Sequence, residues 1–146
     1  MIYFGVVEHA RAVARRAGHS YDPDVNYCIS RVGKSEELLG GVIYTNFTGR
    51  SVQMHQAGFT TAWATPRFMF TIYDFPFYIM KVEKVFATVP STNIRALNIT
   101  RKMGFSPVTS IPGAVPGGDM EILSMSRHEC KYLSLRWRYE VLENVA

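Results

Sequence analysis

His55 is the side chain in this sequence best suited to acid–base chemistry. It lies in a segment from Val52 to Gln56 in which apolar and polar residues alternate. The alternation predicts a β-strand with His55 on the face opposite Met54. A neutral imidazole near pH 7 can take a proton from an ammonium or hydroxyl group, so His55 is a candidate general base. The pattern also fits a hydrogen-bonded structural histidine, and the residues alone leave both interpretations open.

Two polar residues of the preceding apolar segment add to this candidate site. Tyr44 and Asn46 are two positions apart in a strand predicted from Leu39 to Phe47, so we expect their side chains to share one face of it. We expect Tyr44 to assist a histidine base. The predicted catalytic set is therefore His55, Tyr44 and Asn46.

A second chemical feature is a helix start suited to phosphate. Thr65 has the side chain of a helix cap, and Pro66 and Arg67 follow in the first helical turn. The first amides of a helix lack intrahelical partners and carry a partial positive charge, so they can hold phosphate. Arg67 and the hydroxyls of Thr60 and Thr61 would add direct contacts. The alternative is that the loop is closed by Trp63 and binds no phosphate ligand.

The elements that position these residues are organised around the stretch from Val85 to Phe105. It predicts a strand, a turn, a helix and the start of another strand. Pro90 ends the first strand, and the polar side chains at 91–93 can cap the helix. Apolar residues at helical spacing line one face of the helix, and Gly104 follows its last residue.

Hydrophobic periodicity predicts the remaining elements, including a loop rich in Pro and Gly and an amphipathic tail helix after a capping box at Ser126. The predicted strands are Ile2–Val7, Asn26–Val32, Leu39–Phe47, Ser51–Phe59, Phe105–Ile111 and Met120–Met125. Three helices are predicted. The first runs through Ala10–Ala17 and is ended by Gly18, and the second is a buried aromatic helix from Phe68 that Pro76 kinks or ends. The third is the tail helix through Tyr132, Leu135, Tyr139 and Leu142, and the predicted loop is Pro112–Asp119.

Length and composition place limits on the function. The chain of 146 residues suffices for one domain with a real core, which we take to span residues 1–146. Its net charge of +4 suits a phosphate-rich ligand and, less well, nucleic acid. Cys28 and Cys130 are far apart and lack metal-like spacing, which predicts two reduced thiols and no metal site. We see neither a leader peptide nor a membrane span and expect a cytoplasmic protein.

The sequence Asn93-x-x-Ala96, followed by Lys102-Met103-Gly104-Phe105, resembles the closing motif of the GCN5-related N-acetyltransferase (GNAT) family. The resemblance implies an α/β (α+β) fold with a mixed, mostly antiparallel sheet of six to seven strands flanked by helices. It also implies acetyl transfer from acetyl-CoA to an amine. In this family the acceptor meets the thioester near the middle strands, which favours His55 among the histidines.

The family resemblance also assigns a cofactor-binding set. The pantetheine arm of acetyl-CoA would enter between the Ser51–Phe59 and Val85–Val89 strands, with its phosphates at the Thr65 helix start. The set comprises Ala57, Phe59, Thr60, Thr61, Thr65, Arg67, Asn93 and Ala96. The chain departs from the family at Thr100, where a proton-donating Tyr is common, and in the loop before Thr65, which lacks Gly-x-Gly.

Most of the chain also resembles small acetyltransferase-like proteins of tailed bacteriophages, on segments such as Gly40-Gly41-Val42 and Phe75-Pro76-Phe77. This resemblance implies the bacterial host cytoplasm. It leaves open a small-molecule or protein acceptor, and a homodimer. Two alternatives remain. One is a DNA-base-modifying Mom-type enzyme of the same fold, and the other a non-catalytic phage protein that binds a host protein. The basic residues for the DNA contacts would be Arg95, Arg101, Lys102, Lys131, Arg136 and Arg138.

Overall fold

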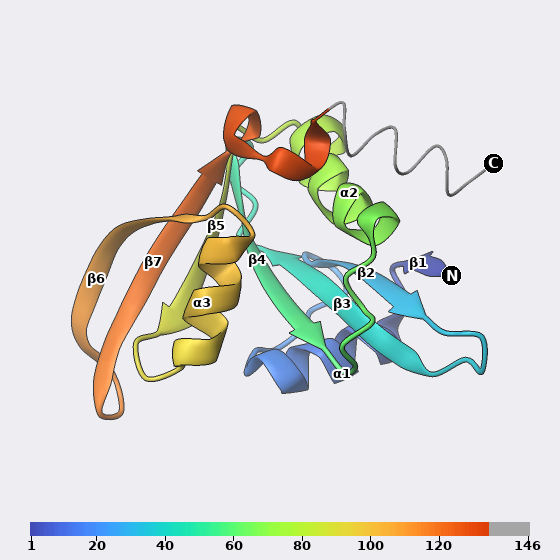
Figure 1. Ribbon diagram of the computed structural model, residues 1–146, viewed down its shortest axis with the longest axis horizontal. Helices are drawn as coiled ribbons and strands as arrows, with labels where there is room; N and C mark the ends of the chain where they lie inside the picture. The colour runs from blue at the N-terminus through green and yellow to red at the C-terminus, as the bar shows by residue number, and fades with distance from the viewer. Residues whose placement is uncertain (135–146) are drawn as a thin grey trace.

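The computed structural model describes residues 1–134 and contains a seven-stranded sheet in the order β1-β2-β3-β4-β5-β7-β6 (Figure 1). Only β4 and β5 are parallel neighbours, and every other adjacent pair is antiparallel. The expected mixed, mostly antiparallel sheet is therefore confirmed. The strands are β1 (Ile2–Phe4), β2 (Tyr27–Val32), β3 (Leu38–Thr45), β4 (Ser51–Gly58), β5 (Lys84–Pro90), β6 (Ser106–Val115) and β7 (Gly118–Ser126).

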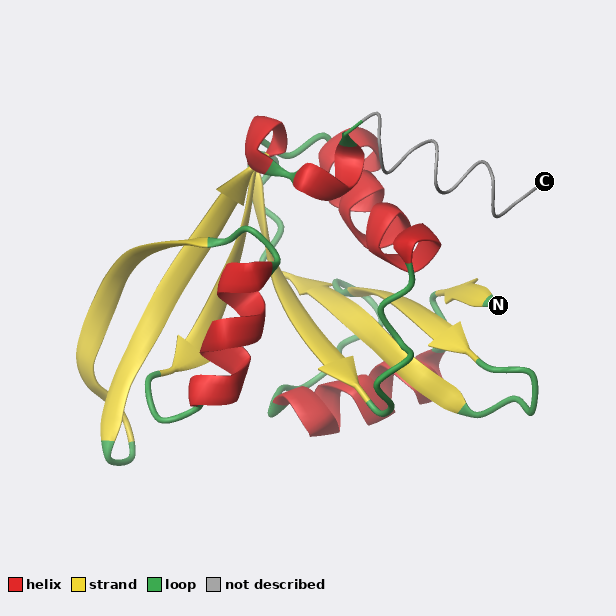
Figure 2. Cartoon of the chain, viewed as in Figure 1, coloured by secondary structure: helices red, strands yellow, loops and turns green. Residues whose placement is uncertain are grey.

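Within residues 1–134, three α-helices cover the two faces of this sheet (Figure 2). Helix α1 (Val7–Ala17) packs on β2, β3 and β4. Helices α2 (Pro66–Asp74) and α3 (Ile94–Lys102) lie on the opposite face and contribute to the main hydrophobic cluster. Because side chains alternate along a strand, each residue of β4 faces either α1 or the α2–α3 side.

The ends of α1 and α2 follow from local sequence signals. Gly18 ends α1 with φ of 73°, a left-handed conformation that glycine adopts without strain. The Thr65 side chain accepts a hydrogen bond from the Phe68 amide, and Pro66 occupies the first turn of α2. Helix α2 ends at Asp74, and Pro76 lies in the π-helical segment that follows, Phe75–Ile79, which confirms the predicted interruption.

The predicted strand–turn–helix unit is confirmed at the centre of the chain. β5 ends at Pro90, and Asn93 caps α3 by accepting a hydrogen bond from the Ala96 amide. Gly104 has φ of 108° just after the helix, where a side chain would be strained. The unit therefore forms from its own local signals, as its sequence predicts.

The predicted loop from Pro112 to Asp119 is wrong for most of its length. β6 continues to Val115, and β7 already begins at Gly118. Pro112 is tolerated because β6 is an edge strand and the pairing with β7 shifts between Ile111 and Val115.

The C-terminal part of the described chain contains two short 3₁₀-helices, Arg127–Glu129 and Lys131–Leu133. The predicted capping box between Ser126 and Glu129 is present, but it starts only the first of these turns. The predicted tail helix lies mostly outside the described residues. Within residues 1–134 no helix combines the length and apolarity needed to cross a bilayer. Both cysteines are buried and free, as expected.

Candidate active site where two central strands separate

The parallel pairing of β4 with β5 is short. It joins three residue pairs and ends at Gln53 and Phe86, although both strands continue. Figure 1 shows the two strands diverging beyond this point. This separation is the one anticipated between the Ser51–Phe59 and Val85–Val89 segments, and it leaves inner edges of both strands without a strand partner within residues 1–134.

The backbone of β4 beyond Gln53 turns hydrogen-bonding groups toward this separation. The Phe59 amide donates to the Leu39 carbonyl on the neighbouring β3. In an antiparallel pair alternate residues point their amides and carbonyls to opposite sides. Residues 54, 56 and 58 therefore direct theirs toward β5, where an extended ligand containing amides could continue the ladder.

Gln56 adds an unsatisfied acceptor on the α2–α3 side of β4. Its Nε2 donates to the Tyr73 hydroxyl over 3.4 Å, whereas its Oε1 is buried and has no hydrogen-bond partner among the described residues. A buried carbonyl without a partner costs free energy and marks a position where a ligand donor fits. The sequence analysis missed Gln56, although its place two residues after Met54 assigns it to this face.

Tyr73 of α2 lies beside Gln56 on the same side and belongs to the main hydrophobic cluster. It is fully buried, stacks on Tyr132 with ring centroids 5.1 Å apart, and donates from its hydroxyl to the Met103 sulfur over 3.7 Å. Burial raises the pKa of Tyr73 well above its usual value, so its hydroxyl stays protonated. The α2–α3 side of β4 is therefore packed by protein at Gln56.

Trp63 lies over the ends of β3 and β4 and explains two glycines. A Cβ atom on Gly40 would come within 2.8 Å of the Trp63 Cβ, and one on Gly58 within 2.3 Å of the indole nitrogen. Glycine is needed at both positions because the indole takes the space of a side chain. The ring thus rests on the paired strands β3 and β4, with its nitrogen toward β4.

The start of α2 lies beside the other edge of the sheet. Thr65, Pro66 and Arg67 line a pocket of about 370 Å³ together with Arg31 and the first two residues of the chain. The Arg31 guanidinium donates to the Ala62 carbonyl and so holds the loop before the helix. Two guanidinium groups and a helix N-terminus make this pocket electropositive.

The remaining members of the predicted cofactor set are spread over several places. Thr60 and Thr61 are exposed in the loop before α2, and Phe59 is 39 % exposed at its start. Ala57 packs on the α1 side with Val13, away from the α2–α3 side. Asn93 uses its side-chain oxygen to cap α3, and Ala96 packs at the edge of the main cluster. Thr100 donates to the Ala96 carbonyl, which occupies its hydroxyl.

His55 points toward the α1 side and is only 6 % exposed. Its Nε2 lies 2.9 Å from the Thr45 hydroxyl, and the His19 ring covers it with centroids 3.6 Å apart. Burial, with a smaller contribution from His19, lowers the pKa of His55 to about 4. The imidazole is therefore neutral at pH 7, as a base must be, but its proton affinity is weakened.

The structure separates Tyr44 from His55, contrary to the expected partnership. Tyr44 pairs with Met54 on the α2–α3 side, is 1 % exposed and donates from its hydroxyl to the Ile72 carbonyl. Its pKa is raised well above the usual value by burial. His55 is on the other face of the sheet, so Tyr44 cannot contact the same reacting group.

Asn46 does not share a face with Tyr44 either. Its backbone turns to a positive φ of 55° after β3, which breaks the strand alternation. Its Nδ2 donates to Gln53 Oε1 over 2.8 Å, and Gln53 Nε2 donates to Thr88 Oγ1 over 2.8 Å. These two consecutive hydrogen bonds link the end of β3 to β4, and β4 to β5, next to the last β4–β5 pair. The sequence analysis missed Gln53 and Thr88 because nothing local indicates that they meet.

No family model matches the sequence, and no curated protein matches it. Its fold, however, matches solved structures of the spermidine/spermine N-acetyltransferase SpeG from Vibrio cholerae. One, solved with manganese ions, has a TM-score of 0.67 at 13 % identity, covering 86 % of this chain and 91 % of that one. A dodecameric structure of the same enzyme in an intermediate state has a TM-score of 0.70 at 14 % identity, covering 91 % and 96 %. The chain therefore has the fold of GNAT acetyltransferases.

Proposed function

We propose that the protein transfers an acetyl group from acetyl-CoA to an amine acceptor. The observation that supports this most directly is the separation of β4 from β5, which leaves the inner edge of β4 unpaired and Gln56 Oε1 without a partner. These groups suit the amides of a pantetheine arm. The named SpeG structures, which share the fold, are acetyltransferases for an amine.

Acetyl-CoA supplies the acetyl group as a thioester. Residues 54, 56 and 58 would hold the extended arm through their backbone, and Gln56 would accept from one of its amides. The phosphates would lie toward the start of α2, where Arg67, Arg31 and the helix amides offer positive charge. Thr60 and Thr61 are exposed beside this path.

In the reaction the amine nitrogen forms a bond to the acetyl carbon as the C–S bond breaks. The amine's proton goes to His55, directly or through water, and solvent protonates the thiolate. In the tautomer whose Nε2–H donates to the Thr45 hydroxyl, Nδ1 is the nitrogen that accepts the proton. Because its pKa is about 4, most of the rate must come from positioning of the two reactants.

Two finer predictions rest on the sequence alone. The phage-like segments support a bacterial host cytoplasm as the location. The homodimer stays a prediction that sedimentation would test; the Vibrio cholerae spermidine N-acetyltransferase of similar fold was solved as a dodecamer.

Calorimetry with acetyl-CoA tests the proposal. We expect saturable binding with one site per chain. Gln56→Met should weaken this binding, because methionine is about as long as glutamine but lacks the oxygen that accepts from the ligand. Asn98→Ala, an exposed change on α3, is the matched control and should leave the affinity unchanged. Absence of binding to acetyl-CoA would overturn the proposal.

A further inference from the structure

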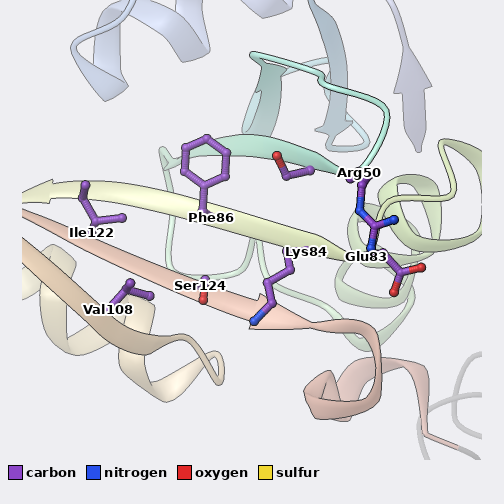
Figure 3. A pocket seen from close by; sticks show the side chains of 8 residues that line it. Arg50, Glu83, Lys84, Phe86, Val108, Ile122 and Ser124 are labelled. Atoms are coloured by element: carbon purple, nitrogen blue, oxygen red, sulfur yellow. The ribbon is translucent and has the colours of Figure 1, made fainter.

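A second pocket lies on the face of β5, β7 and β6 that is opposite α3 (Figure 3). Its volume is about 520 Å³. Helix α1 packs on β2, β3 and β4, so it covers the other half of this face. None of the residues that line this pocket is among those assigned above to acetyl-CoA binding.

The floor of this pocket is apolar. Phe86 of β5 and Ile122 of β7 are half-buried, and Val108 of β6 is 61 % exposed. The register shift between Pro107 and Thr109 marks the irregularity in β6 where Val108 lies. Apolar side chains left open to water in a hollow favour a ligand with an apolar or aromatic body.

The rim of the pocket carries more positive than negative charge. Arg50 and Lys84 are exposed at it with one carboxylate, Glu83, and Figure 3 shows Arg50 and Glu83 at one end with Lys84 beside them. Neither cationic side chain makes an ion pair or side-chain hydrogen bond with another residue of 1–134. Two such cations suit an anionic group on the ligand, and they disfavour a polyamine, which carries only positive charge.

The pocket adjoins the point where the reactants would meet. Phe86 pairs with Gln53 in the last β4–β5 pair, and Thr88 is the next residue on the same face of β5. On the opposite face Tyr73 packs beside Gln56 and Met103 and belongs to the main hydrophobic cluster, so protein side chains cover that face. An acceptor must therefore approach from the face that carries the pocket.

We propose that this pocket binds the non-reacting part of the acceptor, and that the acceptor is an amine with an apolar or aromatic group and a carboxylate. This inference rests on the proposed acetyl transfer. In it, Phe86, Ile122 and Val108 contact the apolar group, and Arg50 and Lys84 bind the carboxylate at the rim. Phe86 and the two cations then determine specificity.

The test uses 3-phenylpropionate, which has the expected shape and charge but no amine, and its neutral amide as the matched probe. By calorimetry the carboxylate should bind about tenfold more tightly than the amide, and Phe86→Ala or the double change Arg50→Gln with Lys84→Gln should each weaken it about tenfold. Phe4→Ala and Arg16→Gln, at exposed positions elsewhere, are controls that should change nothing. A transfer assay with acetyl-CoA should show higher kcat/KM for 4-(2-aminoethyl)benzoate, whose amine and carboxylate are at opposite ends of the aromatic ring, than for spermidine.

The outcomes separate the two proposals. Equal affinity for the two probes, or affinity unchanged by all the pocket variants, overturns the inference. Transfer to spermidine that exceeds transfer to 4-(2-aminoethyl)benzoate, and that Phe86→Ala leaves intact, also overturns it while the proposed function stands. Probe binding without any binding of acetyl-CoA overturns the proposed function and the acceptor role with it. Support requires the binding pattern and the substrate preference together.

Discussion

Gln53 and Thr88 are joined by a hydrogen bond of 2.8 Å at the point where β4 and β5 stop pairing. Gln53 is 6 % exposed, and its oxygen also accepts from Asn46, so both ends of its amide are occupied. The bond therefore ties the two strands together on the α1 side, whereas Tyr73 lies beside Gln56 of β4 on the other side.

Removing this tie should destabilise the fold. Thr88→Val keeps the shape of the side chain but leaves Gln53 Nε2 without its acceptor, so we expect the free energy of unfolding to fall by about 1–2 kcal/mol. Urea unfolding followed by circular dichroism measures it. Thr109→Val on the exposed edge strand β6 is the control. Equal stability of the two variants would show that the bond contributes nothing.

Arg67 is predicted to bind the phosphates of acetyl-CoA. Arg67→Ala should weaken the affinity for acetyl-CoA about tenfold, because a charge-assisted contact is lost. Arg67 is exposed, so the substitution should leave the fold unchanged. Calorimetry at low and high salt measures this, and the difference should shrink as salt rises. Arg11→Ala, on the exposed side of α1, serves for comparison. An affinity unaffected by the loss of Arg67 would remove it from the site.

The buried position of His55 predicts a pH dependence of stability. Because its pKa in the folded chain is about 4 and the ordinary value is 6.5, the unfolded chain takes up the proton first as the pH falls. Stability should therefore decrease on going from pH 7 to pH 5, with His55 contributing about 2 kcal/mol. Urea unfolding at both pH values measures the loss.

Two variants check the cause of this dependence. His55→Asn should show a correspondingly smaller loss of stability between the same pH values. His19→Asn removes the ring that covers His55 and should raise the pKa of His55 toward its usual value, as measured by NMR titration. The same pH dependence in wild type and His55→Asn would rule out this explanation.

His55 also remains the predicted base. His55→Ala should lower kcat at saturating acetyl-CoA by about a hundredfold, the low end for general-base catalysis, because its proton affinity is weak. The exposed His128→Ala is the matched control. Steady-state kinetics with a primary amine measures the effect, and full activity of the His55 variant would end the assignment.

The fold was predictable where structure depends on neighbours in the sequence. Thr65 before Pro66, Gly18 after α1, and the strand–helix unit around Asn93 are local signals, and each appears as expected. The extension of β6 through Pro112 was not predictable, because only its place at the sheet edge makes a missing backbone donor harmless.

The amino-acid sequence by itself determined the helix ends, most strand positions and the face on which His55 lies, because caps and alternation act over a few residues. Only the tertiary structure decided that Tyr44 and His55 are on opposite faces, that His19 covers His55, and that Gln53 reaches Thr88. Those contacts join segments distant in sequence, and they depend on strand register and on the departure of Asn46 from strand geometry. Neither of these is set by the residues next to them in the chain.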